Sequence, residues 1–212
     1  MCGYFFEYIF FENIIQNKTK NCMKKIIEDH FIEHRATLDS VFDLSVSIEK
    51  VAQVLISCLK NNGTIFWCGN GGSASDSQHL AGELVGRFAG DRRPLKSIAL
   101  TADSAVMTCI VNDYGYEHIF SRQVEALGSD GDVLVGITTS GNSQNVLHAF
   151  KKANKTGMIT VGLLGKGGGK AASIINHSII VPSKSTARVQ EMHILIGHIL
   201  CDLIEEELNL KT

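Results

Sequence analysis

The stretch TIFWCGNGGSASDSQHLAGEL, residues 64–84, has the pattern of a strand, a tight turn and a helix. Its first residues form a short apolar run, which is typical of a fully buried strand. The glycines and small hydroxyl residues that follow predict a turn, and we expect a helix from within that turn to Phe88. Two side chains able to carry chemistry, His79 and Glu83, lie four residues apart on this helix.

The same alternation of strand, turn and helix recurs through the rest of the chain. Further strands are predicted in LKSIALTAD (95–103), DVLVGITTS (132–140), MITVGLLG (158–165) and HSIIVPS (177–183). Further helices are predicted over 104–110, over 117–127 and after the turn at 138–143. Apolar strands that alternate with helices predict an α/β fold, in which a parallel sheet is covered on both faces as an αβα sandwich. Ligands of such folds bind at the carboxyl ends of the strands, where the polar turns lie.

Helices are also predicted at both ends of the chain. Residues 24–61 carry an apolar stripe that includes Ile48, Val51 and Leu55, and NNG at 61–63 ends it. The last helix, over 187–208, is apolar on more than one face. A helix of this kind is usually buried, and we expect it to lie between subunits of an oligomer.

Composition limits the class of protein. The chain has 212 residues, 44% of them hydrophobic and 20% charged, which suits one folded domain with a helical extension. A formal net charge of −2 argues against a nucleic-acid-binding protein. An anionic ligand would therefore be held by local dipoles and hydrogen bonds. The six cysteines contain no CxxC pair, which favours reduced thiols in a cytosolic protein over a zinc ribbon or a disulfide framework.

Residues 1–22 are apolar and aromatic, beginning MCGYFFEYIFFENIIQN. No basic region precedes the apolar run and no A-x-A site follows it, so we do not expect a signal peptide. Glu7, Glu12 and Asn13 interrupt it too soon for a membrane span. Met23 opens MKKIIEDHF like a natural start, and we expect residues 1–22 to be an extension without functional weight.

Two glycine-rich turns resemble nucleotide-binding motifs only in part. GNGGSA at 69–74 satisfies G-x-G-x-x-[G/A], but the acidic residue that should follow after about twenty positions comes too late, at Asp103. In GKGGGK at 165–170, Leu164 stands where the first P-loop glycine belongs, and Ala171 replaces the hydroxyl residue. We therefore expect neither a dinucleotide site nor a P-loop.

The best candidate for an anion site is TTSGNSQN at 138–145. Thr138, Ser140 and Ser143 place three hydroxyl groups beside the free N–H groups of a predicted helix start, where the helix dipole favours negative charge. A helix cap needs only one such residue, so the cluster favours phosphate binding over capping alone.

His79 and Glu83 are about 6 Å apart along their helix, close enough to share one ion or one substrate. The last helix carries Gln190, His193 and His198, of which Gln190 and His198 are two turns apart. Neighbouring subunits are expected to complete the site. An isolated i, i+4 pair is more often a surface hydrogen bond, and a histidine on an apolar helix is more often a core residue.

Over roughly residues 24–210 the chain resembles the sugar isomerase (SIS) domain proteins, and within them the phosphoheptose isomerases. The resemblance rests on CGNGGSASDSQHLAGEL, ALTADS, NDYGYEHIFSRQVEALGSDGDVLVGITTSGNSQNV, GGGKAAS and ARVQEMHILIGHILCDLIE. It implies an extension at 1–22, N-terminal helices at 23–61 and one flavodoxin-like SIS domain at 62–210. It also implies a cytoplasmic homotetramer with active sites between subunits and one Zn²⁺ per subunit.

The reaction implied is the aldose–ketose exchange of D-sedoheptulose 7-phosphate and D-glycero-D-manno-heptose 7-phosphate through an enediol, in heptose precursor synthesis for lipopolysaccharide core or capsule. By motif, Glu83 matches the general base and His198 the general acid. The matching metal ligands are His79, Glu83, Gln190 and His198. The matching substrate-binding residues are Asn70, Gly71, Gly72, Ser73, Glu83, Asp103, Asn112, Asp113, Thr138, Ser140, Ser143 and Gln190.

Two positions depart from the family pattern. Thr138 stands where the family often has serine, and Ala187 where some members carry an aspartate. The hydroxyl is kept at the first position, and a substrate contact is lost at the second. The two roles of Glu83 also compete, because a carboxylate held by zinc is a poorer base.

Two other classes of protein compete with the isomerase interpretation. The tail ARVQEMHILIGHILCDLIE also resembles non-catalytic SIS proteins that regulate replication initiation, but these lack a pair like Glu83 and His198. Isomerases of other sugar phosphates, such as arabinose 5-phosphate, normally carry appended regulatory domains, for which this chain has no room.

Overall fold

The computed structural model describes the backbone of residues 3–208 and the side chains of residues 22–208. Within this part of the chain, parallel strands form one five-stranded sheet in the order β2-β1-β3-β4-β5, which is the flavodoxin-like order. The strands are β1 (Ile65–Gly69), β2 (Ser97–Ala99), β3 (Val133–Thr138), β4 (Ile159–Gly165) and β5 (His177–Val181). The predicted α/β fold with a parallel sheet is confirmed.

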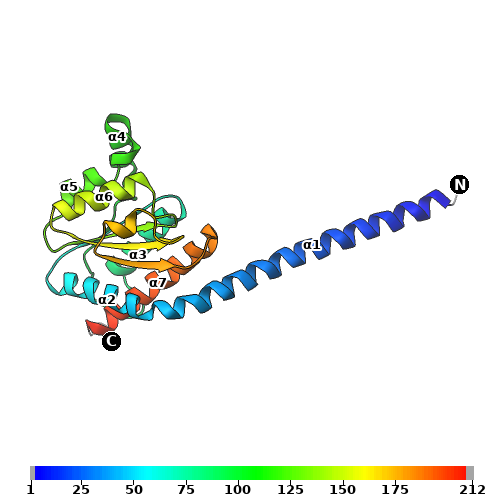
Figure 1. The fold of residues 1–212 in the computed structure, drawn as a ribbon, viewed down its shortest axis with the longest axis horizontal. Coiled ribbons are helices and arrows are strands. Elements are labelled where there is room, and N and C mark those ends of the chain that lie inside the picture. Colours follow the sequence, from blue (N-terminus) through cyan, green and yellow to red (C-terminus); the bar gives the residue numbers. More distant parts are fainter. Residues whose placement is uncertain (1–2, 209–212) are drawn as a thin grey trace.

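Helices cover both faces of the sheet (Figure 1). One face packs against α2 (Ser45–Lys60), α3 (Gly72–Val85) and α7 (Thr186–Glu207), and the other against α5 (Ser121–Leu127) and α6 (Gln144–Lys155). Successive side chains of β1 serve the two faces in turn, so that Trp67 belongs to the first core and Phe66 to the second. This double burial explains why the strands read as continuous apolar runs.

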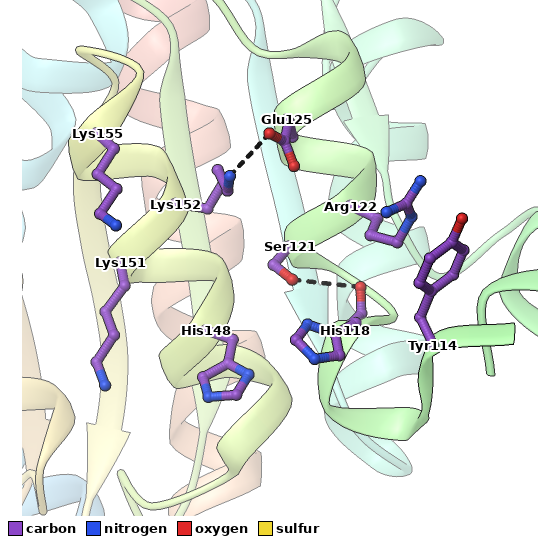
Figure 2. Close-up of a pocket in the computed structure, with 9 residues that line it drawn as sticks. All are labelled: Tyr114, His118, Ser121, Arg122, Glu125, His148, Lys151, Lys152 and Lys155. Atoms are coloured by element: carbon purple, nitrogen blue, oxygen red, sulfur yellow. Dashed lines mark hydrogen bonds and ion pairs between the residues drawn. The ribbon is translucent and has the colours of Figure 1, made fainter.

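Several elements differ in length from the sequence prediction. The strand expected over 95–103 is hydrogen-bonded only over β2, and the helix expected to reach Phe88 ends at Val85. Helix α4 (Ser104–Tyr114) runs one turn further than expected and stands out from the body (Figure 1). The helix expected over 117–127 is divided into a 3-10 turn, η2 (Tyr116–His118), and α5, which lies beside α6 (Figure 2).

The N-terminal helix α1 (Gly3–Val41) extends away from the body as a single helix (Figure 1). A short turn, η1 (Phe42–Leu44), separates it from α2, so the helical prediction over 24–61 is confirmed with one break. Arg188 on α7 anchors α1 by donating to the carbonyl of His30 at 2.8 Å. The side chains of residues 1–21 lie outside the described residues, and the interpretation of 1–22 as an extension stays a prediction.

Much of helix α7 is buried by contacts within the chain, and the expectation that it also lies between subunits stays a prediction. Val189, Met192 and Ile196 have no exposed surface and belong to the first core. Leu195, Ile199 and Leu203 are only partly buried, and together with residues of α1 and α2 they line a cleft of about 440 Å³. The helix is apolar on several faces because it packs against the sheet, α2 and α3 at once.

His193 on α7 is fully buried and faces the carbonyl of Leu164 at 3.0 Å from its Nε2 atom. Burial lowers the pKa of this imidazole from 6.5 to about 4, although the bond to Leu164 partly opposes the shift. His193 is therefore a neutral core residue.

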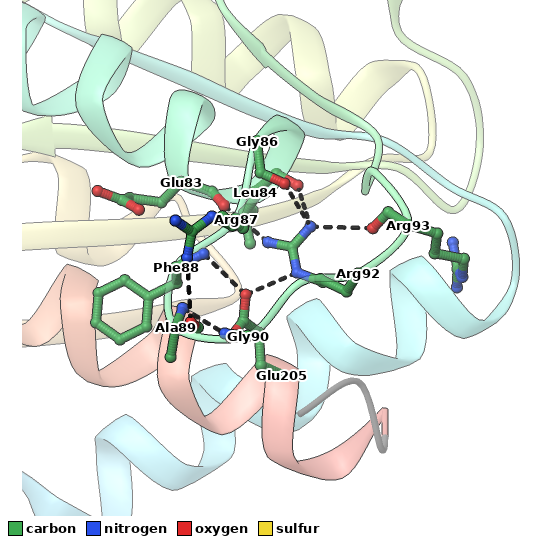
Figure 3. A network of polar contacts seen from close by, with 10 residues as sticks. All are labelled: Glu83, Leu84, Gly86, Arg87, Phe88, Ala89, Gly90, Arg92, Arg93 and Glu205. Carbon is green, nitrogen blue, oxygen red and sulfur yellow. Dashed lines mark hydrogen bonds and ion pairs between the residues drawn. The ribbon is translucent and has the colours of Figure 1, made fainter. Parts of the chain in front are cut away.

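A buried ion pair joins the loop after α3 to helix α7 (Figure 3). Arg92 Nε and Glu205 Oε1 are 2.7 Å apart, and both side chains are almost fully enclosed, at 1% and 0% exposure. Glu205 also accepts the backbone N–H groups of Phe88, Ala89 and Gly90.

The other donors of Arg92 close the end of α3. They reach the carbonyls of Glu83, Leu84, Gly86 and Arg93, the first at 2.7 Å. Burial alone would raise the pKa of Glu205, but the backbone N–H groups and Arg92 outweigh it and lower the pKa to about 2. The pair thus fixes the turn that carries Glu83 against the last turns of α7.

Other features bear on the class of protein. The five cysteines of the described part (Cys22, Cys58, Cys68, Cys109 and Cys201) are free, and Cys2 lies outside it. Among the described residues, no helix combines the length and apolar character that crossing a membrane requires.

We predict that replacing His193 with Gln flattens the dependence of stability on pH. The folded-state pKa lies below the usual value, so the unfolded chain binds more protons between about pH 4 and 6.5, and stability falls as the pH drops through that range. Urea unfolding should show wild-type protein losing about 2 kcal/mol from this group between pH 7 and pH 5. His193→Gln keeps a donor for Leu164 without the titration; an unchanged slope would contradict the assignment.

We also predict that Arg92→Met lowers the free energy of unfolding by about 3 to 5 kcal/mol, because it leaves the buried Glu205 carboxylate without its cation. Urea unfolding at pH 7 measures the loss. Arg93→Met is the matched control, since Arg93 is exposed and should change stability by less than about 0.5 kcal/mol. Equal stabilities of the two variants would show that the pair does not stabilise the fold.

Candidate active site

Three side chains from two helices meet at one point. His79 and Glu83 lie one turn apart on α3, with 3.2 Å between His79 Nε2 and Glu83 Oε1. His198 comes from α7, and its Nε2 is 2.8 Å from that of His79. All three ligand atoms lie within 4.8 Å of one another. The predicted meeting of these residues is therefore present within a single chain.

The chemistry of this trio suits both proton transfer and a metal. Two imidazole nitrogens and one carboxylate oxygen match the three-ligand sets of catalytic zinc sites, in which a fourth position stays open for substrate. The His79 side chain is about half exposed and that of Glu83 is one-fifth exposed, so the site faces solvent. Phe88 covers one side of His198, with ring centroids 5.6 Å apart.

Gln190, the fourth predicted ligand, is bonded elsewhere. Its Nε2 donates to Asp76 Oδ1 at 3.4 Å, and its side chain packs on Gly72, where a Cβ would overlap the amide. Asp76 is buried one turn before His79, and its second oxygen has no partner. Burial raises the pKa of Asp76, while the bond to Gln190 and the charge of His79 partly oppose the shift.

The predicted phosphate-binding hydroxyls converge at the end of β3. Thr138 Oγ1 is 3.1 Å from Ser143 Oγ and 3.5 Å from Ser140 Oγ. Ser143 occupies the N-cap position of α6, yet its hydroxyl makes no capping hydrogen bond. Ordinary capping therefore does not account for this residue, and we call residues 138–143 the hydroxyl loop.

The glycine-rich turn at 165–170 packs against the backbone of the hydroxyl loop. Gly141 has a φ of +64°, and a Cβ there would overlap the carbonyl of Gly168. Lys170 N donates to Asn142 Oδ1 at 3.1 Å, and Ala171 N donates to the carbonyl of Gly141 at 3.0 Å. The glycines that resemble a P-loop thus allow two backbone segments to touch.

A third polar group lies beside the hydroxyl loop. Asn70, at the end of β1, exchanges hydrogen bonds of 2.8 and 2.9 Å with Asn145 at the start of α6. The Asn70 oxygen also accepts the hydroxyl of Tyr116 at 2.7 Å. These three residues and Ser143 line a cavity of about 540 Å³. The ends of β1 and β3, where the strand order reverses, therefore frame one polar hollow.

The remaining predicted substrate residues are more dispersed. Gly71 takes a φ of +58° that glycine allows, and Ser73 is buried against Gly69. The Asp103 carboxylate caps α4 by accepting from Val106 N. Asn112 donates to Asp113 Oδ1 on α4, the helix that projects from the body (Figure 1). Within one chain these last two do not join the site, and their roles stay predictions.

Sequence reasoning missed four residues that shape the site: Asp76, Tyr116, Asn145 and Arg92. Three of them stand inside quoted motifs: Asp76 in CGNGGSASDSQHLAGEL, Asn145 in TTSGNSQN and Tyr116 in NDYGYEH. Asp76 and Arg92 act through partners on α7, more than a hundred residues away.

Comparisons with known proteins agree with this geometry. The sequence model of the SIS domain matches residues 30–165. A phosphoheptose isomerase from Campylobacter jejuni is 51% identical over 184 residues, which cover 87% of this chain and 99% of the relative. Another from Nitratiruptor is 52% identical over 185 residues, again covering 87% of this chain and 99% of the relative.

A solved phosphoheptose isomerase from Neisseria gonorrhoeae superposes with a TM-score of 0.82 at 44% identity, covering 87% of this chain and 99% of that one. One from Francisella tularensis gives 0.83 at 38% identity, with coverage of 86% and 97%. The chain therefore belongs to the SIS domain family, among the phosphoheptose isomerases.

Proposed function

We propose that the protein interconverts D-sedoheptulose 7-phosphate and D-glycero-D-manno-heptose 7-phosphate, in heptose precursor synthesis for lipopolysaccharide core or capsule. The observation that carries this proposal is the meeting of Glu83 with two histidines in a chain about half identical to named phosphoheptose isomerases. The same relatives favour catalysis over a regulatory role in replication, because the names they carry are those of an enzyme.

Substrate binding divides between two strand ends. The hydroxyl loop offers Thr138, Ser140 and Ser143 to the phosphate, together with the N-terminus of α6. Asn70 at the end of β1 presents its amide to the sugar hydroxyls. Fixing the phosphate at one end orients the carbon chain, which lowers the entropic part of the barrier at the other end.

The proton transfers belong to Glu83 and His198. Glu83 takes the proton from C1 of the open-chain ketose while His198 gives a proton to O2, which produces a 1,2-enediol. Glu83 then returns its proton to C2, and His198 takes the proton from O1, which gives the aldose. Each transfer contributes about 10²- to 10⁴-fold to the rate, and no net proton is gained or lost.

A zinc ion is part of the proposal, held by His79, Glu83 and His198, with Gln190 as the further predicted ligand. The donor chemistry of the trio supports it. When bound, such an ion would polarise the carbonyl and stabilise negative charge on the oxygens. Glu83 would then serve both as a metal ligand and as the base. A carboxylate oxygen that binds the metal could not also accept the proton, so the base would be the other oxygen.

We further propose a cytoplasmic homotetramer. Helix α1 supports assembly because Met23, Ile27 and Phe31 recur on one side of it and are all exposed by more than half. The apolar cleft between α1, α2 and α7 is a second surface that a partner subunit would cover. Assembly would also bring the projecting α4, with Asn112 and Asp113, near a neighbouring site.

Replacing Glu83 with Gln should reduce turnover of sedoheptulose 7-phosphate by at least about 10²-fold, because the amide cannot accept the C1 proton. The rate of aldose formation measures the effect, and circular dichroism with sedimentation checks that the oligomer stays folded. Asp130→Asn, an exposed change in the loop before β3, is the control. A folded Glu83→Gln protein with undiminished activity would overturn the mechanism.

Removal of metal should abolish turnover, and added Zn²⁺ should restore it. Independently of activity, elemental analysis should find about one zinc per chain in wild-type protein and much less in His79→Ala, which loses a ligand. His193→Gln is the matched control on α7 and should keep its zinc, since His193 is bonded to a backbone carbonyl. Full activity after exhaustive chelation, with no zinc retained, would refute the metal site.

A further inference from the structure

The cleft between α5 and α6 is lined by positive side chains that the proposed reaction does not use (Figure 2). Its volume is about 430 Å³, and its lining includes Arg122, Lys151, Lys152 and Lys155 together with His118 and His148. Glu125 is the one carboxylate in that lining. Such a concentration of positive charge is unexpected in a chain whose formal net charge is −2.

Local pairing neutralises only part of this charge. Lys152 Nζ is 2.9 Å from Glu125 Oε1, and these two side chains compensate each other. Lys151 and Lys155 have no ionic partner among the residues that the structure describes. They extend from consecutive turns of α6, about 6 Å apart along the axis. That spacing suits two separate anionic groups better than one.

Arg122 is oriented for anion binding. Its guanidinium lies 3.7 Å from the centroid of the Tyr114 ring, a cation–π contact that holds the plane of the group. Stacking occupies the face of a guanidinium and leaves its N–H edge for oxygen atoms, which phosphate groups accept in a bidentate manner.

Two stacked imidazoles form the floor of the cleft near the hydroxyl loop. The rings of His118 and His148 are 5.3 Å apart, and the buried Nδ1 atom of His148 has no hydrogen-bond partner. His148 also lines the cavity that contains Ser143 and Asn145. The positive cleft therefore begins one helical turn beyond the hydroxyl loop and continues along α6.

We infer that this cleft is a second anion site, distinct from the hydroxyl loop, which takes a small molecule carrying a diphosphate or two phosphate groups. Lys151 and Lys155 would each contact one phosphoryl group, and Arg122, which lies across the Lys152–Glu125 pair from them, would add positive charge from the α5 side (Figure 2). A bound polyanion relieves the repulsion between Lys151 and Lys155, which have no ionic partner among the described residues. Since α6 starts at the hydroxyl loop, occupancy of the cleft can alter how that loop holds the substrate.

The test is a calorimetric titration of the intact protein with inorganic pyrophosphate in low salt, with inorganic phosphate as a comparison. The double variant Lys151→Ala/Lys155→Ala should bind pyrophosphate at least about tenfold more weakly than wild type. Lys50→Ala/Lys60→Ala removes the same charge from α2 and should change the affinity by less than about twofold. Binding should also weaken as salt is added.

A second pair of variants separates the two sites. Thr138→Val/Ser143→Ala alters the hydroxyl loop and should retain a pyrophosphate site that the two α6 lysines control. Loss of all pyrophosphate binding in that variant, or wild-type binding in Lys151→Ala/Lys155→Ala, would overturn the inference. A changed sedimentation coefficient of the lysine variant would also overturn it, because the charges would then belong to a subunit contact.

Discussion

Arg92 and Glu205 form the contact on which the geometry of the trio depends. The pair lies between the end of α3 and the last turns of α7, the two helices that carry the trio. Each partner also satisfies several backbone groups, so neither charge is left without compensation. A buried ion pair costs much desolvation energy and seldom adds net stability over an apolar pair. Here the pair orients the last turn of α3, because Arg92 donates a hydrogen bond to the backbone carbonyl of Glu83 itself.

The rest of the site follows from the order of the strands. Strand β2 pairs with one side of β1, and β3 pairs with the other side. The loops that follow β1 and β3 therefore leave the same end of the sheet in opposite directions. One loop leads into α3 and the trio, and the other forms the hydroxyl loop and leads into α6. In the proposed reaction, phosphate binding and proton transfer therefore belong to segments that follow two different strands of one sheet, as is common in open α/β folds.

Much of this could be predicted from the sequence because the relevant signals are local. The strand, turn and helix pattern predicted the parallel sheet, and the grouping of Thr138, Ser140 and Ser143 predicted converging hydroxyls. What could not be predicted depends on long-range packing. Gly168 touches the hydroxyl loop from a different strand end, and His193 differs from His198 only in which side of α7 it faces. The predicted ends of helices were wrong where tertiary contacts decide them. Helix α3 is an example, because Arg92 binds the carbonyls of its last turn.

The contact between Gly141 and Gly168 places a constraint on a segment that never needs to touch a ligand. Residues 167–169 all have positive φ values, and two of them lie against the backbone of the hydroxyl loop or the side chain of Asn142. A side chain at Gly168 would meet Ala172 and Ile180, and one at Gly169 would meet the carbonyl of Ser140. The phosphate affinity that we propose for the hydroxyl loop would thus depend partly on the absence of side chains about thirty residues downstream of the hydroxyls themselves. Mutational drift there would appear as a substrate-binding defect with no altered substrate contact.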